Sequence, residues 1–158
     1  MHIAVDFDGT IVEHKYPKIG SEIPGAIDNL KAMVADGHKL ILWTVREEDL
    51  LVEAVQFCSM RGLDFYAVNA DDPDVMWDPH KQTRKLCNVD LYIDDRQVGG
   101  LPDWDEIHRY VNKLSNRNLK AEAKEHKKRK KKHLKKHHQS IFARIAARSR
   151  EARANLSH

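Results

Sequence analysis

Short apolar runs alternate along the chain with segments in which apolar residues recur every three or four positions. Four runs are expected to be buried strands, because they are apolar and end at polar or turn-forming residues: 2–5, 39–43, 65–68 and 89–93. Three segments have the spacing of helices: 24–36, 48–61 and 103–114. Gly37 and Gly62 follow the first two and suit helix ends.

The helical spacing also predicts which side chains face a core. Each predicted helix has one apolar face, formed by Ile27, Leu30 and Val34 in the first, Leu51, Val55 and Cys58 in the second, and Trp104, Ile107, Tyr110 and Val111 in the third.

Strands that alternate with helices indicate βαβ units. The expected fold class is α/β, a Rossmann-like three-layer arrangement with a parallel sheet between helices. Ligands in such sheets bind outside the carboxyl ends of the strands. Asp6, Thr44 and Asp94 each follow a predicted strand. We therefore expect these three side chains to meet at one edge of the sheet.

The charge of the chain is divided unevenly between two parts. Residues 1–114 contain 12 Lys and Arg against 21 Asp and Glu, whereas 115–158 contain 15 against 3. An acidic domain over 1–114 and a polybasic tail over 115–158 are therefore expected, the tail helical or partly disordered. Within the tail, Leu134, Ile141, Phe142 and Ile145 give a short apolar face.

The cellular setting is indicated by three features of the sequence. It has only two cysteines, Cys58 and Cys87, both interpreted as structural. It has no apolar span long enough to cross a membrane and no basic leader followed by an apolar stretch. These features favour a reducing, cytoplasmic compartment.

The first strand ends in two carboxylates, within Asp6-Phe7-Asp8-Gly9-Thr10. Side chains alternate along a strand, so Asp6 and Asp8 would point to the same side if the strand continued through them. Two carboxylates that close repel each other unless a cation lies between them or one is protonated. The pattern therefore predicts a site for a hard cation.

This motif resembles the first motif of the haloacid dehalogenase-like hydrolases, most of which are magnesium-dependent phosphatases. The resemblance implies that Asp6 is the nucleophile, which forms an aspartyl-phosphate. It implies that Asp8 is the general acid and later the base that activates water, and that its backbone carbonyl helps to bind Mg²⁺.

Three later segments resemble the other motifs of this superfamily. Thr44 follows a strand, and the resemblance implies that its hydroxyl binds a phosphate oxygen. Asp94 and Asp95 match the acidic pair of the fourth motif; Asp94 would bind Mg²⁺ with Asp6, and Asp95 could complete the shell through water. The motif lysine is Lys85 or Lys81; Lys85 is preferred because it lies just ahead of the fourth strand.

Arg46 has two interpretations at this stage. At the mouth of a pocket it would hold a phosphate or a substrate carboxylate in a bidentate fork. Alternatively it would pair with Glu47 or Asp49. Asn69 is a further candidate for the pocket rim, and Arg96 is expected to be structural. A bacterial-type receiver domain combines similar residues, but in a different order along the chain.

The segments between the predicted elements are too short to hold a second domain. The chain therefore resembles the capless members of the superfamily, whose open sites suit large substrates or a cap from a partner subunit. The sequence predicts a Mg²⁺-dependent phosphatase that hydrolyses phosphomonoesters; its substrate is not specified.

The alternative function lies in the tail. A cationic helix neutralises phosphates without reading sequence, so residues 117–153 are a candidate nucleic-acid-binding segment, with the domain as a scaffold or acting on nucleic-acid phosphate ends. A membrane surface, contact with the acidic domain and contact with another copy in a homo-oligomer are further alternatives for this segment, as is a solvated extension.

Overall fold

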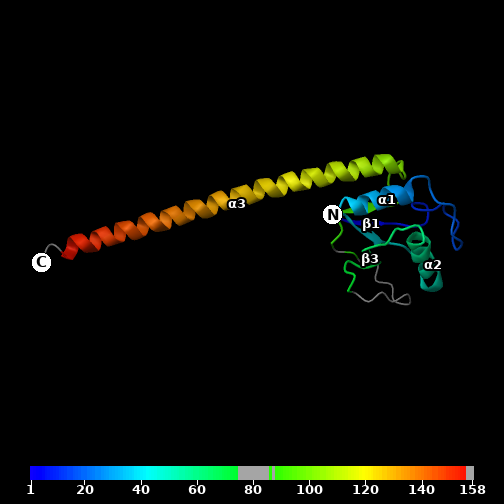
Figure 1. The fold of residues 1–158 in the computed structure, drawn as a ribbon, viewed down its shortest axis with the longest axis horizontal. Helices are drawn as coiled ribbons and strands as arrows, with labels where there is room; N and C mark the ends of the chain where they lie inside the picture. Colours follow the sequence, from blue (N-terminus) through cyan, green and yellow to red (C-terminus); the bar gives the residue numbers. More distant parts are fainter. Residues whose placement is uncertain (75–85, 87, 156–158) are drawn as a thin grey trace. The chain divides into compact units, whose positions relative to one another are not determined.

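The computed structural model of the chain describes residues 1–74, 86 and 88–155, with side chains of the last helix described as far as residue 133 (Figure 1). Strands and helices alternate as the sequence predicts. In chain order they are β1 (His2–Val5), α1 (Ala26–Ala35), β2 (Lys39–Leu42), α2 (Glu48–Ser59), β3 (Ala67–Val68), β4 (Leu91–Ile93) and α3 (Trp104–Asn155).

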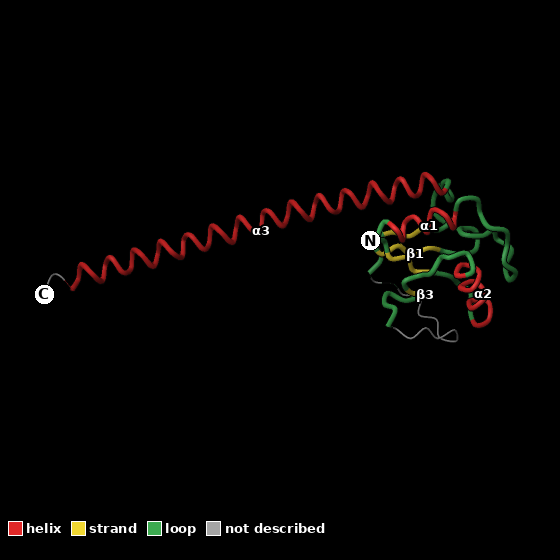
Figure 2. Tube along the Cα trace, in the orientation of Figure 1, coloured by secondary structure: helices red, strands yellow, loops and turns green. Residues whose placement is uncertain are grey.

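The four strands form one parallel sheet in the order β3-β2-β1-β4. Figure 2 shows the strands in yellow and the helices in red. β1 therefore lies between β2 and β4, and all four strands end at the same edge. The predicted α/β class with a parallel sheet is confirmed. This topology brings the residues after β1, β2 and β4 close together.

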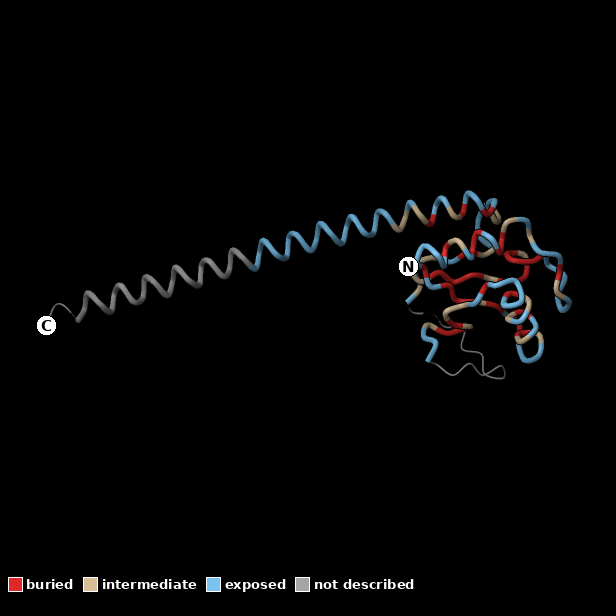
Figure 3. Tube along the Cα trace, viewed as in Figure 1, coloured by how far each residue is buried: buried red, intermediate tan, exposed pale blue. Residues whose placement is uncertain are grey.

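The core is built on one face of the sheet. Ile3 and Val5 of β1 pair in register with Leu40 and Leu42 of β2, and all four are buried. They belong to one apolar cluster with buried residues of α1, α2 and the first turns of α3 (Figure 3). Burial of such side chains contributes about 1.5–3 kcal/mol each, so this cluster is a main source of stability.

Two predicted core positions are wrong. Val34 is 43% exposed and Tyr110 is 55% exposed. The buried stripe of α1 is centred on Leu30 and Met33, so Val34 lies at its edge in the last turn. Tyr110 lies at the edge of the stripe that Trp104, Ile107 and Val111 form on α3, for the same reason.

The chain divides into two compact units, Met1–Lys113 and Leu114–His158, and α3 runs through the boundary between them. The prediction that a separate domain helix ends near residue 114 is wrong. No glycine or proline follows to end it. Within the described residues, no helix combines the length and the apolar character needed to span a membrane.

The start of α3 is tied to α1 by two polar contacts. Asn29 Nδ2 donates to Asp105 Oδ1 at 3.0 Å, and His108 Nε2 lies 2.9 Å from Asp36 Oδ2. Both contacts lie within the first unit. They fix the segment that precedes α3, which carries the residues after β4.

Candidate active site

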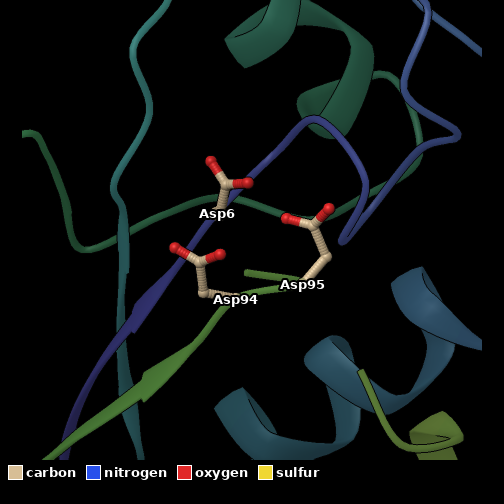
Figure 4. A group of neighbouring side chains, drawn as sticks. All are labelled: Asp6, Asp94 and Asp95. Carbon is tan, nitrogen blue, oxygen red and sulfur yellow. The ribbon is translucent and has the colours of Figure 1, made fainter. Parts of the chain in front are cut away.

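Three carboxylates meet where β1 and β4 end. The Asp6 N–H donates to the Ile93 carbonyl at 3.0 Å, which continues the pairing of the two strands by one residue. Asp94 and Asp95 follow directly. One carboxylate oxygen from each of Asp6, Asp94 and Asp95 lies within 4.8 Å of the other two. Figure 4 shows the three side chains gathered at this edge of the sheet. The predicted convergence of Asp6 and Asp94 is therefore observed.

The turn after Asp6 brings the backbone against this cluster. The Phe7 carbonyl accepts from the N–H groups of Thr10, Ile11 and Val12. Gly9 has a φ of +92°, and a Cβ at this position would overlap the Asp95 carboxylate. Only glycine meets both the conformational and the steric requirement here.

Thr10 positions Asp95 from across the sheet edge. Its Oγ1 accepts from the Asp95 N–H at 3.0 Å, and its carbonyl accepts from Trp104 Nε1 at 3.3 Å. The sequence presents Thr10 only as the last residue of a motif. Its contact with Asp95 spans 85 positions, so no local pattern reveals it.

The electrostatics of the cluster favour a cation. Burial is the main cause that raises the pKa of Asp6 from 3.8 to about 7; the neighbouring charges of Asp94, Asp95 and Asp8 raise it further, and a backbone hydrogen bond from Phe7 opposes them. Asp95 Oδ1 is buried without a hydrogen-bond partner among the described residues. A bound hard cation would offset the crowded negative charge and would give Asp95 Oδ1 a partner. These oxygen donors therefore fit a divalent ion such as Mg²⁺.

Thr44 is held rigidly at the end of the neighbouring strand. Its N–H donates to Asn69 Oδ1 at 2.9 Å, and its carbonyl accepts from Asn69 Nδ2 at 3.1 Å. Its Oγ1 accepts from the Arg46 N–H at 3.3 Å, which leaves the hydroxyl hydrogen for donation. Asn69 is buried, so its role is to support Thr44 rather than to form the rim.

The prediction that Arg46 lies at the pocket mouth is wrong. Its side chain is completely buried and donates to Asp8, Nε to Oδ2 and Nη2 to Oδ1, both at 2.7 Å. Neither Glu47 nor Asp49 is the carboxylate in this fork. Burial of a guanidinium is tolerated here because a bidentate carboxylate compensates its charge.

Arg46 also holds the loop after β1. Its Nη1 donates to the Pro17 carbonyl and its Nη2 to the Lys18 carbonyl, both at 3.0 Å. Its guanidinium lies over the rings of Phe7 and Tyr16. One buried side chain thus connects Asp8, the segment after β2, and the loop that carries Tyr16.

A pocket of about 430 Å³ lies over these groups. It brings together four of the predicted residues with five neighbours: Asp6, Asp8, Thr44 and Asp94, with His14, Tyr16, Trp43, Val45 and Arg96. No periodic signal in the sequence marks His14 or Tyr16, because both lie in an irregular loop. Arg96, predicted to be structural, lines the pocket, and its N–H donates to Asp94 Oδ1 at 2.8 Å.

The Asp8 side chain lines the pocket but is outside the group of three clustered carboxylates, so its predicted metal contact depends on its backbone carbonyl. Lys81 and Lys85, the two candidates for the motif lysine, lie outside the described residues.

The chain is similar to a conserved protein of known structure. No family model and no curated protein matches it. A solved structure, that of a conserved protein from Bacteroides thetaiotaomicron, is 52% identical with a TM-score of 0.64; the match covers 72% of this chain and 91% of the other. At this identity and coverage, the chain belongs to the same family as the conserved Bacteroides thetaiotaomicron protein.

Proposed function

We propose that this protein is a Mg²⁺-dependent phosphatase of the haloacid dehalogenase-like type, with a capless α/β domain. The observation that carries the proposal is the meeting of Asp6, Asp94 and Asp95 at one sheet edge, with Thr44 and Asp8 lining the same pocket. Phosphoryl transfer needs a nucleophile, a cation site, a hydrogen-bond donor to the phosphate oxygens and a carboxyl group for proton transfer.

Asp6, Asp94 and Asp95 would hold the metal, together with the backbone carbonyl of Asp8. When bound, Mg²⁺ supplies positive charge that offsets the negative charge of these carboxylates and of the substrate phosphate. Thr44 donates its hydroxyl hydrogen to a phosphate oxygen. The exposed Arg96 supplies a further positive charge at the pocket wall.

Asp6 acts as the nucleophile. One of its oxygens attacks phosphorus, the bond from phosphorus to the leaving oxygen breaks, and an aspartyl-phosphate forms. The leaving oxygen takes a proton from Asp8. A water molecule then gives a proton to Asp8 and attacks phosphorus, which releases phosphate and restores the Asp6 carboxylate.

Arg46 constrains the proton transfer by Asp8. Both Asp8 oxygens accept from the guanidinium, so Asp8 must release one of these bonds and take up a proton from solvent before it can give a proton to a leaving group. Arg46 contacts Asp8 rather than the pocket contents, and we assign it as a positioning residue. The pair keeps Asp8 on the pocket wall with a defined orientation.

The substrate is a phosphomonoester with room around its leaving group. Unit Met1–Lys113 is one compact body, and residues 6–25 between β1 and α1 are too few to form a separate cap domain, which supports a capless enzyme with an open site. Trp43 and Tyr16 provide aromatic surface beside the phosphate position. Large phosphorylated substrates would be admitted by such a site.

Hydrolysis of a generic aryl phosphate, with Mg²⁺ and with a chelator, tests the proposal. Wild type should turn over only with the metal, and Asp6→Asn should abolish turnover while the folded near-ultraviolet circular dichroism is retained. The matched control is Asp49→Asn, an exposed aspartate in the first turn of α2, which should leave turnover unchanged. Turnover that persists in Asp6→Asn would refute the mechanism.

A further inference from the structure

The segment of α3 from residue 116 to residue 133 presents a strongly basic exposed surface. All 18 of its residues are exposed (Figure 3). Nine of them are Lys or Arg and two are Glu. This surface takes no part in the proposed hydrolysis.

Four of the lysines lie along one side of the helix. Lys120, Lys124, Lys127 and Lys131 are spaced by four, three and four residues. At 3.6 residues per turn, this spacing places them within roughly 60° of one another around the axis. A shallow depression of the helix surface is lined by lysines alone, among them Lys124, Lys127 and Lys131. We call Lys120, Lys124, Lys127 and Lys131 the lysine face.

The acidic residues of the segment do not neutralise the lysine face. Glu122 and Glu125 project from other sides of the helix, and neither is three or four residues from a lysine-face residue. Glu125 Oε1 instead lies 3.4 Å from Arg129 Nε. The helix therefore has a purely cationic side and a mixed side.

The surroundings of the lysine face identify the chemistry of its partner. Leu119 is the only large apolar residue in 116–133, whereas a helix lying on a membrane needs an apolar face. The segment has no Phe, Tyr or Trp on which unpaired bases would stack. These features leave a hydrophilic polyanion with paired bases as the best fit.

The dimensions fit the backbone of a duplex. The lysine face extends over roughly 16 Å at a rise of about 1.5 Å per residue. A duplex carries about one phosphate charge per 1.7 Å of its axis, so a row of this length faces several phosphates. We propose that the lysine face binds the phosphate backbone of double-stranded nucleic acid without reading its base sequence.

This proposal does not depend on the hydrolase activity, because the lysine face and the carboxylate cluster share no residue. It is tested by fluorescence anisotropy of the full chain with labelled duplexes of roughly 20 base pairs in two unrelated sequences. The binding constant should be equal for the two sequences. Its logarithm should fall linearly with the logarithm of the salt concentration. Single strands and anionic lipid vesicles are the comparison ligands, and both should bind more weakly.

Two charge-matched double variants test the orientation. Lys124→Gln with Lys131→Gln removes two lysine-face charges and should lower the salt slope by about 2 and the affinity at about 0.1 M salt by at least tenfold. Arg129→Gln with Lys132→Gln removes the same charge from other sides of the helix. This variant should change the salt slope and the affinity much less. Glutamine favours helix nearly as well as lysine, so both double variants should keep the helix content of the wild type, which circular dichroism measures.

Several results would overturn the proposal. An equal loss of duplex affinity in the two double variants would mean that all sides of the helix bind alike and that the lysine face has no special role. Tighter binding to vesicles or to single strands would assign the segment to a different partner. Absence of duplex binding at about 50 mM salt would exclude nucleic acid, and it would leave the phosphatase proposal untouched.

Discussion

The guanidinium of Arg46 holds both carboxylate oxygens of Asp8 at 2.7 Å, and both side chains are almost completely closed to solvent. In the proposed mechanism Asp8 gives a proton to the leaving group. Arg46 therefore influences the reaction through Asp8, without touching the substrate. This relationship separates Arg46 from residues that bind phosphate directly.

Arg46→Lys should therefore affect substrates according to their leaving groups. A lysine keeps the charge but cannot form the bidentate fork. Hydrolysis of an alkyl phosphate, which needs a proton at the leaving oxygen, should fall about 100-fold in kcat/KM. Hydrolysis of p-nitrophenyl phosphate, whose leaving group needs little protonation, should fall much less. Steady-state kinetics over a series of leaving groups measures the difference.

The control for this series is Arg61→Lys. Arg61 also donates to a carboxylate, Glu22 Oε2 at 3.2 Å, and lies over an aromatic ring, that of Phe57, but it does not line the pocket. Arg61→Lys should leave kcat/KM unchanged for every substrate of the series. A uniform loss across the series in Arg46→Lys would indicate a purely structural arginine and contradict the positioning role.

The carboxylate cluster illustrates what a sequence predicts well. Asp6 and Asp94 could be placed together because apolar runs identify the strands and parallel strands end at one edge of a sheet. Arg46 and Thr10 could not be placed in the same way. Their contacts, with Asp8 and Asp95, span 38 and 85 positions and depend on side-chain directions that no periodicity encodes.

The helix boundaries show a related limit. The glycines after α1 and α2 mark their ends, since Gly37 and Gly62 both have positive φ. No such residue follows the first turns of α3, so the predicted boundary near residue 114 had only a change in charge to support it. Charge changes the solvation of a helix without ending its hydrogen bonding.

Asp6→Asn should stabilise the metal-free protein at neutral and alkaline pH. The pKa of Asp6 is raised from 3.8 to about 7, so between these values the folded state binds more protons than the unfolded state. The stability of the wild type therefore falls as pH rises through this range. At pH 8 the variant should be more stable by on the order of 2–4 kcal/mol, and the difference should vanish near pH 4.

Urea unfolding in the presence of a chelator, from pH 4 to pH 8, measures this difference. Asp49→Asn again serves as the control and should follow the wild type at every pH. Addition of Mg²⁺ at pH 8 should stabilise the wild type more than Asp6→Asn. A variant that is less stable than the wild type at pH 8 would contradict the account of the cluster.

Gly9→Ala should disturb the cluster directly. Its methyl group overlaps the Asp95 carboxylate, and its φ of +92° disfavours any side chain. Gly37→Ala is a close control, because Gly37 has a φ of +85° but open space around the added carbon. Both variants should lose about 1–2 kcal/mol from backbone strain. Only Gly9→Ala should also weaken Mg²⁺ binding, measured by calorimetry; equal metal affinity in both variants would contradict the close approach.

Asn69→Gly should loosen Thr44 without adding strain. Asn69 has a φ of +49°, which glycine adopts freely, so the variant removes the buried side chain and its two hydrogen bonds to the Thr44 backbone without straining the backbone. Because these groups are buried, the free energy of unfolding should fall by about 1–3 kcal/mol. The Thr44 hydroxyl would then be less well placed for phosphate, and KM for an aryl phosphate should rise while the pH profile of kcat keeps its shape. An unchanged KM would mean that Thr44 does not contact the phosphate, since its support would be lost without effect on binding.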